Sequence, residues 1–329
     1  MGYILCHGGR KVMNRKVETI FTSKKAVIPA AILCTLLWGS AFPCVKTGYA
    51  MFSIESSDTF SILLFAGCRF FLAGLLTLCV SRILNRRLIQ PDRSNLKGVL
   101  LLSLFQTFSS YFLYYISLAH LTGAKGAILN STNIFFAVIL SHFCFADDKV
   151  TLRKFIGCAV GFAGVILVNL SRGGLALSFT LSGEGFMILS AGLYAAGNVI
   201  CKKLKGSMEP VSLNGWQLSI GGLLLILTGL AGGGRLRLTS PFGVLLLAYM
   251  VFISATAFTL WYLLITYHPV GSISIFNFLT PVFGTLLSGI FLHENVLTPA
   301  NLTALICVCL GIFIVNLTAP KPAGPGGKL

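Results

Sequence analysis

Ten stretches of about 20 mostly apolar residues run through this chain of 329 residues, and they limit the folds it can adopt. A helix of about 20 residues crosses the roughly 30 Å hydrocarbon core of a bilayer. Because that core offers backbone groups no hydrogen-bonding partner, the crossings must be helices or a closed barrel. The stretches are rich in leucine and do not alternate as barrel strands do. The sequence therefore predicts an all-α polytopic membrane protein.

The predicted transmembrane helices cover residues 27–50, 60–82, 96–117, 122–145, 151–170, 182–203, 211–231, 241–266, 269–292 and 299–318. Only 10% of the residues are charged, against about 25% in soluble domains, which agrees with this fold class. A net charge of +16 would suit a nucleic-acid-binding protein, but nearly all the Lys and Arg lie in short loops beside the apolar stretches. We therefore expect no nucleic acid as a partner, and a lipid bilayer as the surroundings.

The distribution of positive charge predicts how the helices are oriented. If the N-terminus lies inside, 19 Lys and Arg fall on the inner side and five on the outer side, and Arg69 lies within a span. Cytoplasmic loops carry the excess of Lys and Arg in multi-pass proteins. Both termini are therefore expected in the cytoplasm, with the protein in the plasma membrane, or in the inner membrane of a bacterium.

Two tails flank the predicted spans. Residues 1–25 are basic and lack the apolar core of a signal peptide, so they are expected to form a cytoplasmic tail, in which Met13 is an alternative start. Residues 319–329 are rich in Pro and Gly and are expected to be disordered.

An internal repeat organises the rest of the chain into two units, 26–171 and 181–318. Residues 122–170 align without a gap on 269–317, at an offset of 147 and with 10 identities in 49 positions. The identities include Asn130 with Asn277, and weaker matches extend through the other helices. Five helices in each unit is an odd number, so the two units must cross the membrane in opposite orientations. The sequence thus predicts two inverted five-helix repeats, an architecture typical of transporters with alternating access.

Several motifs, in a duplicated order, resemble the EamA-type ten-helix permeases of the drug/metabolite transporter superfamily. They are Leu36-Leu37-Trp38-Gly39-Ser40-Ala41-Phe42-Pro43, Arg69-Phe70-Phe71-Leu72-Ala73-Gly74, Gly183-Glu184-Gly185, Leu279-Thr280-Pro281-Val282-Phe283 and His293-Glu294-Asn295-Val296-Leu297-Thr298. The resemblance covers about residues 27–318. It implies an exporter of amino acids or related small metabolites, with a central cavity lined by spans 1, 3, 4, 6, 8 and 9. A drug or a sugar-type metabolite is the alternative cargo.

This chain departs from the family pattern at two places. Ile134 stands at the first-repeat counterpart of Pro281, and Asp147-Asp148 stands where the family usually has Gly-Glu. Both departures leave the fold unaffected, but they weaken any inference about a particular substrate. Thr151 and Thr298 are predicted to be helix N-caps. Asp147 and Glu294 precede them, and we expect these carboxylates to stabilise the dipole of the helix that follows.

Polar residues at helical spacing predict which helix faces line a cavity. Span 3 carries Ser103, Thr107, Ser110, Tyr114 and Ser117 on one face, and the other candidate lining residues are Trp38, Asn130, Tyr194, Asn198, Trp261 and Asn277. An unpaired amide in hydrocarbon costs several kcal/mol, so these faces are expected to point inward. The alternatives remain open for each. Ser, Thr and Asn also join packed helices, and Trp and Tyr also gather at membrane interfaces.

Arg69 is the charged residue expected inside a span, and its counterpart in the second repeat is Gln217. It can bind a substrate carboxylate, or it can bond to neighbouring helices and brace the fold. The family's arginine lies outside the helices that form the cavity, which favours bracing. No Asp or Glu falls near the middle of a span. We therefore expect a neutral, polar and aromatic cavity that suits neutral or zwitterionic metabolites.

Other classes of protein find less support in the sequence. An intramembrane enzyme needs a nucleophile and base, or metal ligands, brought together. The five His residues lie in the tail or towards span ends, and no C-x-x-C or zinc-ligand spacing occurs. We therefore expect no enzyme activity, no cofactor and no metal, and a channel is disfavoured by the inverted repeat. The expected partners are a small-molecule metabolite and the bilayer, and a homodimer remains open.

Overall fold

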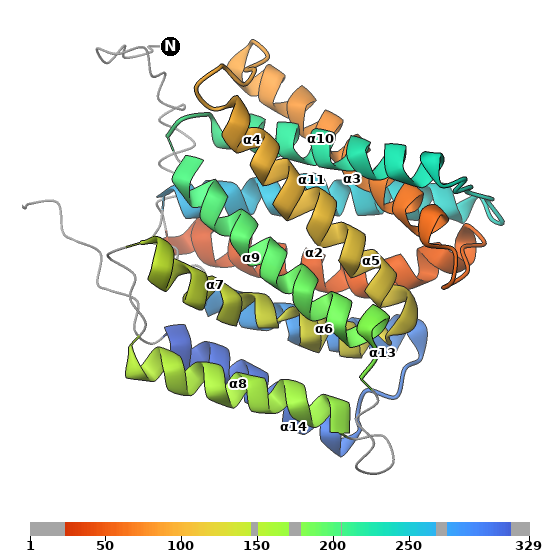
Figure 1. The fold of residues 1–329 in the computed structure, drawn as a ribbon, viewed down its shortest axis with the longest axis vertical. Helices are drawn as coiled ribbons and strands as arrows, with labels where there is room; N and C mark the ends of the chain where they lie inside the picture. Colours follow the sequence, from red (N-terminus) through yellow and green to blue (C-terminus); the bar gives the residue numbers. More distant parts are fainter. Residues whose placement is uncertain (1–23, 146–150, 171–178, 205, 268–274, 317–329) are drawn as a thin grey trace, which may run out of the picture.

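Helices make up nearly all of the computed structural model, which describes residues 24–145, 151–170, 179–204, 206–267 and 275–316 (Figure 1). The first repeat contains α2 (Lys24–Met51), α3 (Thr59–Asn85), α4 (Leu96–Leu102), η1 (Ser103–Ser109), α5 (Ser110–His120), α6 (Gly123–Asn130), α7 (Thr132–Cys144) and α8 (Leu152–Leu170). The second contains η2 (Leu181–Gly185), α9 (Phe186–Leu204), α10 (Pro210–Ala231), α11 (Phe242–Tyr267), η3 (Ile275–Phe278), α13 (Leu279–Leu292) and α14 (Pro299–Asn316).

These elements form ten helical tracts within the described ranges, each within one predicted span or a few residues of it. Seven of the tracts are long and apolar enough to cross a membrane, and the apolar parts of α8, α13 and α14 are shorter. The first six residues of predicted span 9, and nearly all of both predicted tails, lie outside the described residues. Helix α2 begins at Lys24, so the last two residues of the predicted N-terminal tail belong to a helix. The all-α polytopic membrane fold is confirmed.

Local sequence signals explain where the helices begin and end. The carboxylate of Asp58 accepts a hydrogen bond from the backbone N–H of Ser61 at the start of α3, and Arg86 ends that helix with a positive φ of 56°. Helix α10 starts with Pro210, whose fixed φ suits a first helical position. The carboxylate of Glu209 accepts from two free N–H groups of the same turn. Side chains at the starts of α3 and α10 thus satisfy N–H groups that have no partner within the helix.

The packing of the two repeats follows a pseudo-two-fold axis. Helices α3 and α10 are repeat counterparts and pack against each other, as do α8 and α14, and the two pairs lie at opposite ends of the long axis in Figure 1. Helix α2 packs on α13, and its counterpart α9 packs on α7 and α6. Likewise α2 contacts α11, and α9 contacts η1 and α5. Equivalent helices of the two repeats thus make equivalent contacts with the opposite repeat. Because each repeat has five spans, an odd number, the two repeats are inverted relative to each other in the membrane.

Glycines allow the backbones of α3 and α10 to approach closely. A Cβ built on Gly222 would lie 2.3 Å from the backbone nitrogen of Phe71, and one built on Gly74 would lie 2.3 Å from the Oγ of Ser219. The pair α8 and α14 repeats this design at Gly311, whose Cβ would lie 2.4 Å from the carbonyl oxygen of Gly157. Small residues have this role in membrane helix pairs, because lipid gives helices no hydrophobic reason to associate.

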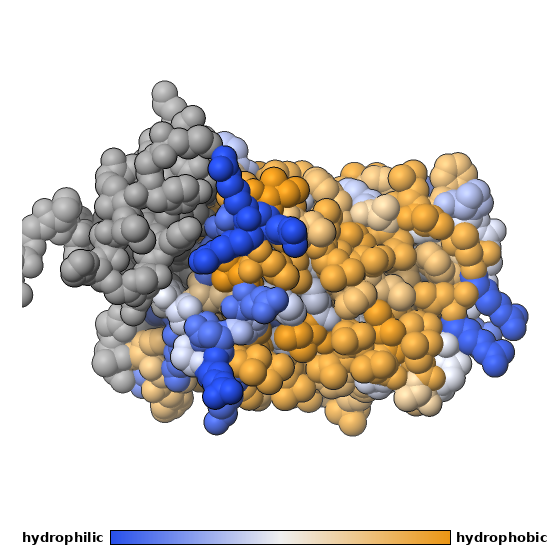
Figure 2. Space-filling model, turned by 90° about the horizontal axis from the view of Figure 1, so that it is seen from above, coloured by the Kyte–Doolittle hydropathy of each residue, from blue (hydrophilic) through white to orange (hydrophobic). Residues whose placement is uncertain are grey.

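The outer surface of the molecule matches a bilayer. Figure 2 shows a broad band of apolar residues, with hydrophilic residues gathered towards the two ends of the molecule. The band includes lipid-facing leucines of the close helix pair, such as Leu72 and Leu76 of α3 and Leu223 and Leu227 of α10. In a soluble protein such a surface would cause aggregation, and here it is the face that hydrocarbon covers.

We predict that Gly222→Val prevents normal assembly of α3 with α10, because its Cβ overlaps the backbone of Phe71. Overpacking of this kind costs about 1–3 kcal/mol when side chains can yield, and backbone yields less easily. In detergent, the variant should show a lower melting temperature and a smaller monodisperse fraction than wild type. Leu223→Val is the matched control, since Leu223 is 43% exposed towards lipid. Equal stability of the two variants would contradict the close packing.

Candidate central cavity

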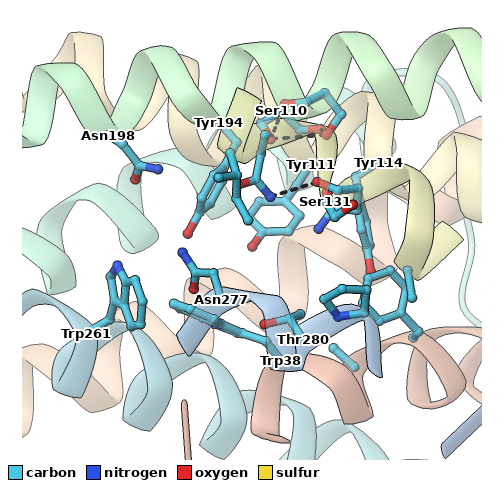
Figure 3. A pocket seen from close by; sticks show the side chains of 18 of the residues that line it. Trp38, Ser110, Tyr111, Tyr114, Ser131, Tyr194, Asn198, Trp261, Asn277 and Thr280 are labelled. Atoms are coloured by element: carbon cyan, nitrogen blue, oxygen red, sulfur yellow. Dashed lines mark hydrogen bonds between the residues drawn. The ribbon is translucent and has the colours of Figure 1, made fainter. Parts of the chain in front are cut away.

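A cavity lies between the two repeats, where the helices of the predicted cavity meet. Its lining consists of Trp38, Ala41, Phe42, Arg69, Ser110, Tyr111, Tyr114, Ala127, Asn130, Ser131, Asn133, Ile134, Ser190, Tyr194, Asn198, Trp261, Asn277, Thr280 and Pro281. The space among these side chains is about 830 Å³, including the part open to solvent. Figure 3 shows Asn277 pointing into this space between Tyr194 and Trp38.

The structure brings together most of the residues selected from the sequence. The cavity lining includes Trp38, Arg69, Tyr114, Asn130, Tyr194, Asn198, Trp261 and Asn277. All six helical tracts expected to line the cavity contribute to it, and they are joined by α3 through Arg69. Their convergence is a finding about geometry, and a role in binding stays a prediction for each residue.

Thr107 does not line the cavity, contrary to the expectation. Its hydroxyl instead donates a hydrogen bond to the side-chain oxygen of Gln217 on α10, and Thr107 is buried against Gly221. The cause is η1, a π-helical segment whose wider turns rotate Ser103 and Thr107 away from the face that carries Ser110. The single polar face expected on span 3 is therefore split between the α10 contact and the cavity. No residue spacing in the sequence signals a π-helical segment.

Two groups of aromatic rings line the cavity. The rings of Trp38 and Trp261 meet edge to face with centroids 5.0 Å apart, and Phe258 packs on Trp38 at 5.6 Å. Tyr111 and Tyr114 form a second edge-to-face pair at 5.6 Å. Edge-to-face pairs hold such rings in fixed orientations. A rigid aromatic wall can accept an apolar group, and its ring faces can accept a cation.

Two kinds of amide face the cavity. The amide of Asn198 already has a hydrogen-bond partner, because its Oδ1 accepts a hydrogen bond from Gln106. Gln106 in turn accepts one from Tyr262. The side-chain amides of Asn130 and Asn277 have no hydrogen-bond partner within the described part of the chain. An unpaired amide offers both a donor and an acceptor. This pair, at equivalent positions of the two repeats, is therefore available to a polar ligand.

Further polar atoms in the cavity lining also lack a partner. The indole nitrogen of Trp38 and the hydroxyl of Thr280 are buried and form no hydrogen bond. Buried polar groups are normally paired, so unpaired ones in a cavity indicate a place for a ligand or water. The sequence also gave a signal for one lining residue that was not selected. Tyr111 precedes Tyr114 by one helical turn.

Arg69 corrects the expectation of a neutral cavity. It reaches the cavity from α3, is only 2% exposed, and is the charged residue among those that line the cavity. Its Nε donates to the hydroxyl of Ser254, and its Nη1 donates to the hydroxyl of Tyr115, both at 2.9 Å. The guanidinium carbon lies 5.0 Å from the centre of the Phe70 ring. Arg69 therefore both braces neighbouring helices and gives the cavity a positive charge.

Carboxylates tie the two repeats together at the end of the bundle predicted to lie outside. Glu184 of η2 forms an ion pair with Lys125 of α6. Glu294 accepts hydrogen bonds from the first two backbone N–H groups of α6, those of Gly123 and Ala124. The hydroxyl of Thr298 accepts from the backbone N–H of Asn301, which confirms Thr298 as the predicted N-cap of α14. Glu294 was expected to stabilise the start of that same helix, but it binds the start of α6. Asp147, the counterpart of Glu294, lies outside the described residues.

No group of three or more His, Cys, Asp or Glu side chains is arranged to hold a metal ion among the described residues. The cavity lining contains hydroxyl, amide, indole and guanidinium groups, and these can bind a polar molecule through hydrogen bonds. Its nineteen residues include no carboxylate, imidazole or thiol that could serve as a general base. The arrangement therefore suits recognition.

The family is decided by a direct match. The model of the EamA-like transporter family matches residues 25–170 and again residues 181–317, which together cover most of the chain. The chain belongs to the EamA-like transporter family. The double match reflects the two repeats that pack about the pseudo-two-fold axis. Membership of this family makes the chain a transporter protein with a multi-pass membrane fold.

Curated relatives and a solved structure are similar along most of the chain. The uncharacterized transporter YvbV of Bacillus subtilis is 29% identical over 289 residues, which cover 85% of this chain and 88% of that protein. An uncharacterized transporter of Archaeoglobus fulgidus is 26% identical, with 86% and 95% covered. One solved crystal structure superposes with a TM-score of 0.68 over 90% of this chain and 98% of its own, at 16% identity. That likeness establishes the fold alone.

We predict that a cysteine at position 130 is accessible from water and one at position 107 is not. In a cysteine-free background, Asn130→Cys should react with a small, charged thiol reagent in permeabilised membranes, because residue 130 lines the cavity. Thr107→Cys should stay unreactive, since residue 107 is packed against Gly221. Labelling is measured by the mass shift of the intact protein. Reaction at 107 with none at 130 would place the cavity elsewhere.

Proposed function

We propose that this protein transports small neutral or zwitterionic metabolites, with amino acids as the leading class, across the membrane by alternating access. The unpaired amides of Asn130 and Asn277 carry the proposal. Each can donate and accept hydrogen bonds, so together they suit a ligand that has both kinds of group. The aromatic wall beside them suits an apolar substituent. The family match supports transport itself and leaves the substrate class open.

Two observations support alternating access. The repeats are related by a pseudo-two-fold axis, and the cavity lies between them, so a movement of one repeat against the other can change which side opens. In addition, Glu294 of the second repeat holds the start of α6 in the first repeat through directed hydrogen bonds. Such contacts can break and re-form as units, which gives the transporter two distinct arrangements.

The remaining parts of the proposal rest on the sequence. We expect export, a plasma-membrane or bacterial inner-membrane location, and both termini in the cytoplasm. The lipid bilayer and the transported metabolite are the proposed partners, a homodimer is compatible with the apolar outer surface, and no nucleic acid is involved. Enzymatic activity is not part of the proposal, because the cavity lining offers hydrogen-bonding groups and contains no carboxylate, imidazole or thiol. A sugar-type metabolite or a drug is the alternative cargo.

We predict that Asn130→Leu and Asn277→Leu each raise the KM for transport about 10- to 100-fold. Removing either amide leaves a polar group of the substrate unpaired, at a cost of about 1–3 kcal/mol. The measurement is uptake of a radiolabelled amino acid mixture into proteoliposomes, followed by kinetics on the best substrate. Rates are normalised to correctly inserted protein.

Asn214→Leu is the matched control. Asn214 is a buried amide, but it donates to Thr259 and joins α10 to α11 away from the cavity. Its loss should lower stability and leave the KM unchanged. Wild-type kinetics in both cavity variants would show that Asn130 and Asn277 do not bind substrate.

A further inference from the structure

Arg69 is a buried cation that forms no ion pair with any of the described residues. Only 2% of its surface is exposed, and its two hydrogen bonds go to neutral hydroxyl groups. The ion pair found among the described residues joins Lys125 to Glu184, which are not in the cavity lining. Its Nη2 has no acceptor in the described part of the chain. A charge held in this way is costly, and intramembrane charges usually mark a substrate or ion path.

The second repeat shows that bracing at this position does not need a charge. Gln217 is the repeat counterpart of Arg69. Ser254 is the counterpart of Thr107, at the offset of 147 that also relates Asn277 to Asn130. The hydroxyl of Thr107 donates to the side-chain oxygen of Gln217, whereas the hydroxyl of Ser254 accepts from Arg69, so the same two positions are joined with the donor reversed. The two repeats thus contain the same contact, once with a neutral amide and once with a guanidinium. The charge therefore has a purpose beyond joining helices.

Only the charged member of this pair reaches the cavity. Arg69 lines the cavity with Tyr111 and Tyr114, whereas Gln217 and Thr107 are buried between α10 and η1 and do not line it. Ser254 and Tyr115 hold the guanidinium in a fixed orientation through two of its five N–H groups. The remaining N–H groups form a fork of the kind that matches a carboxylate.

We propose that Arg69 binds a carboxylate of the transported molecule and makes this protein selective for carboxylate-bearing metabolites over amines. This inference rests on the proposed transport function and narrows its substrate class. A carboxylate at Arg69 supplies the missing counter-charge. The rest of the molecule then extends towards Asn130, Asn277 and the Trp38–Trp261 pair, where amides and ring faces can accept an ammonium group. No carboxylate side chain lines the cavity to hold an amine by itself.

The test compares substrates that differ only in the carboxylate. Wild-type protein in proteoliposomes is assayed with radiolabelled leucine, phenylalanine and threonine. Competitors are the unlabelled amino acid, its N-acetyl form, its methyl ester and the corresponding decarboxylated amine. The ester and the amine should compete about 10- to 100-fold more weakly than the amino acid, because each lacks a charged hydrogen bond to Arg69. The N-acetyl form keeps the carboxylate and should still compete.

Arg69→Gln is the decisive variant, because it copies the neutral residue that the second repeat already uses at this position. It should weaken apparent affinity for the amino acid about 10- to 100-fold and leave affinity for the ester nearly unchanged. Ser254→Ala is the matched control, since it removes one bracing bond and keeps the charge. It should retain the preference for the carboxylate.

Three results would overturn the proposal. If wild type transports an amino acid but the ester or amine competes equally well, Arg69 does not recognise a carboxylate, and the transport function stands. The same holds if correctly inserted Arg69→Gln keeps the full preference. If correctly inserted wild type transports none of the three amino acids, the amino-acid function fails, and this inference fails with it. Should Arg69→Gln not insert, the competition on wild type decides alone.

Discussion

The need to pair every polar group in hydrocarbon is the constraint on which this structure depends. Backbone groups meet it within helices, and side chains meet it across helix pairs, as Asn214 does with Thr259 and Ser110 does with Ser190. Glycines such as Gly222 bring the backbones close enough for this pairing. Among the described residues, buried hydroxyls of Ser219, Thr285 and Ser288 stay unpaired elsewhere, but the cavity around the pseudo-two-fold axis holds the unpaired indole of Trp38 and hydroxyl of Thr280. There the cost of leaving them free becomes binding energy for a molecule that enters.

Duplication explains why the cavity lies at the centre and why its two sides differ. Equivalent helices contribute equivalent groups, so Asn130 faces the cavity from one repeat and Asn277 from the other. Divergence then distinguishes the repeats, most clearly where Arg69 has Gln217 as its counterpart. A symmetric scaffold supplies the movement, and an asymmetric lining gives a bound molecule a preferred direction. In this scheme the neutral contact between Gln217 and Thr107 maintains the fold, and Arg69, in contact with Ser254, also binds the substrate.

Much of the fold and part of the candidate site could be predicted from the sequence. The hydrophobic stretches gave the helices because their length matches the bilayer, and the repeat located Asn130 and Asn277 because duplication preserves position. Thr107 was misplaced because a π-helical turn depends on packing against α10, and no local pattern records it. Bracing was favoured for Arg69 because its helix was not among those expected to line the cavity, and only the three-dimensional structure shows that its long side chain also reaches the cavity. Glu294 was assigned to the nearest helix in the chain, whereas its partner is nearer in space.

The central claim is that a substrate binds between the two repeats, in contact with the paired amides. An experimental structure of the protein in lipid nanodiscs, determined with and without a transported amino acid, addresses it at atomic level. We expect ligand density in the cavity between Asn130 and Asn277, with its carboxylate within hydrogen-bond distance of Arg69 and its side chain against Trp38. Ligand density outside the cavity, with the amides of Asn130 and Asn277 unchanged between the two structures, would contradict the claim.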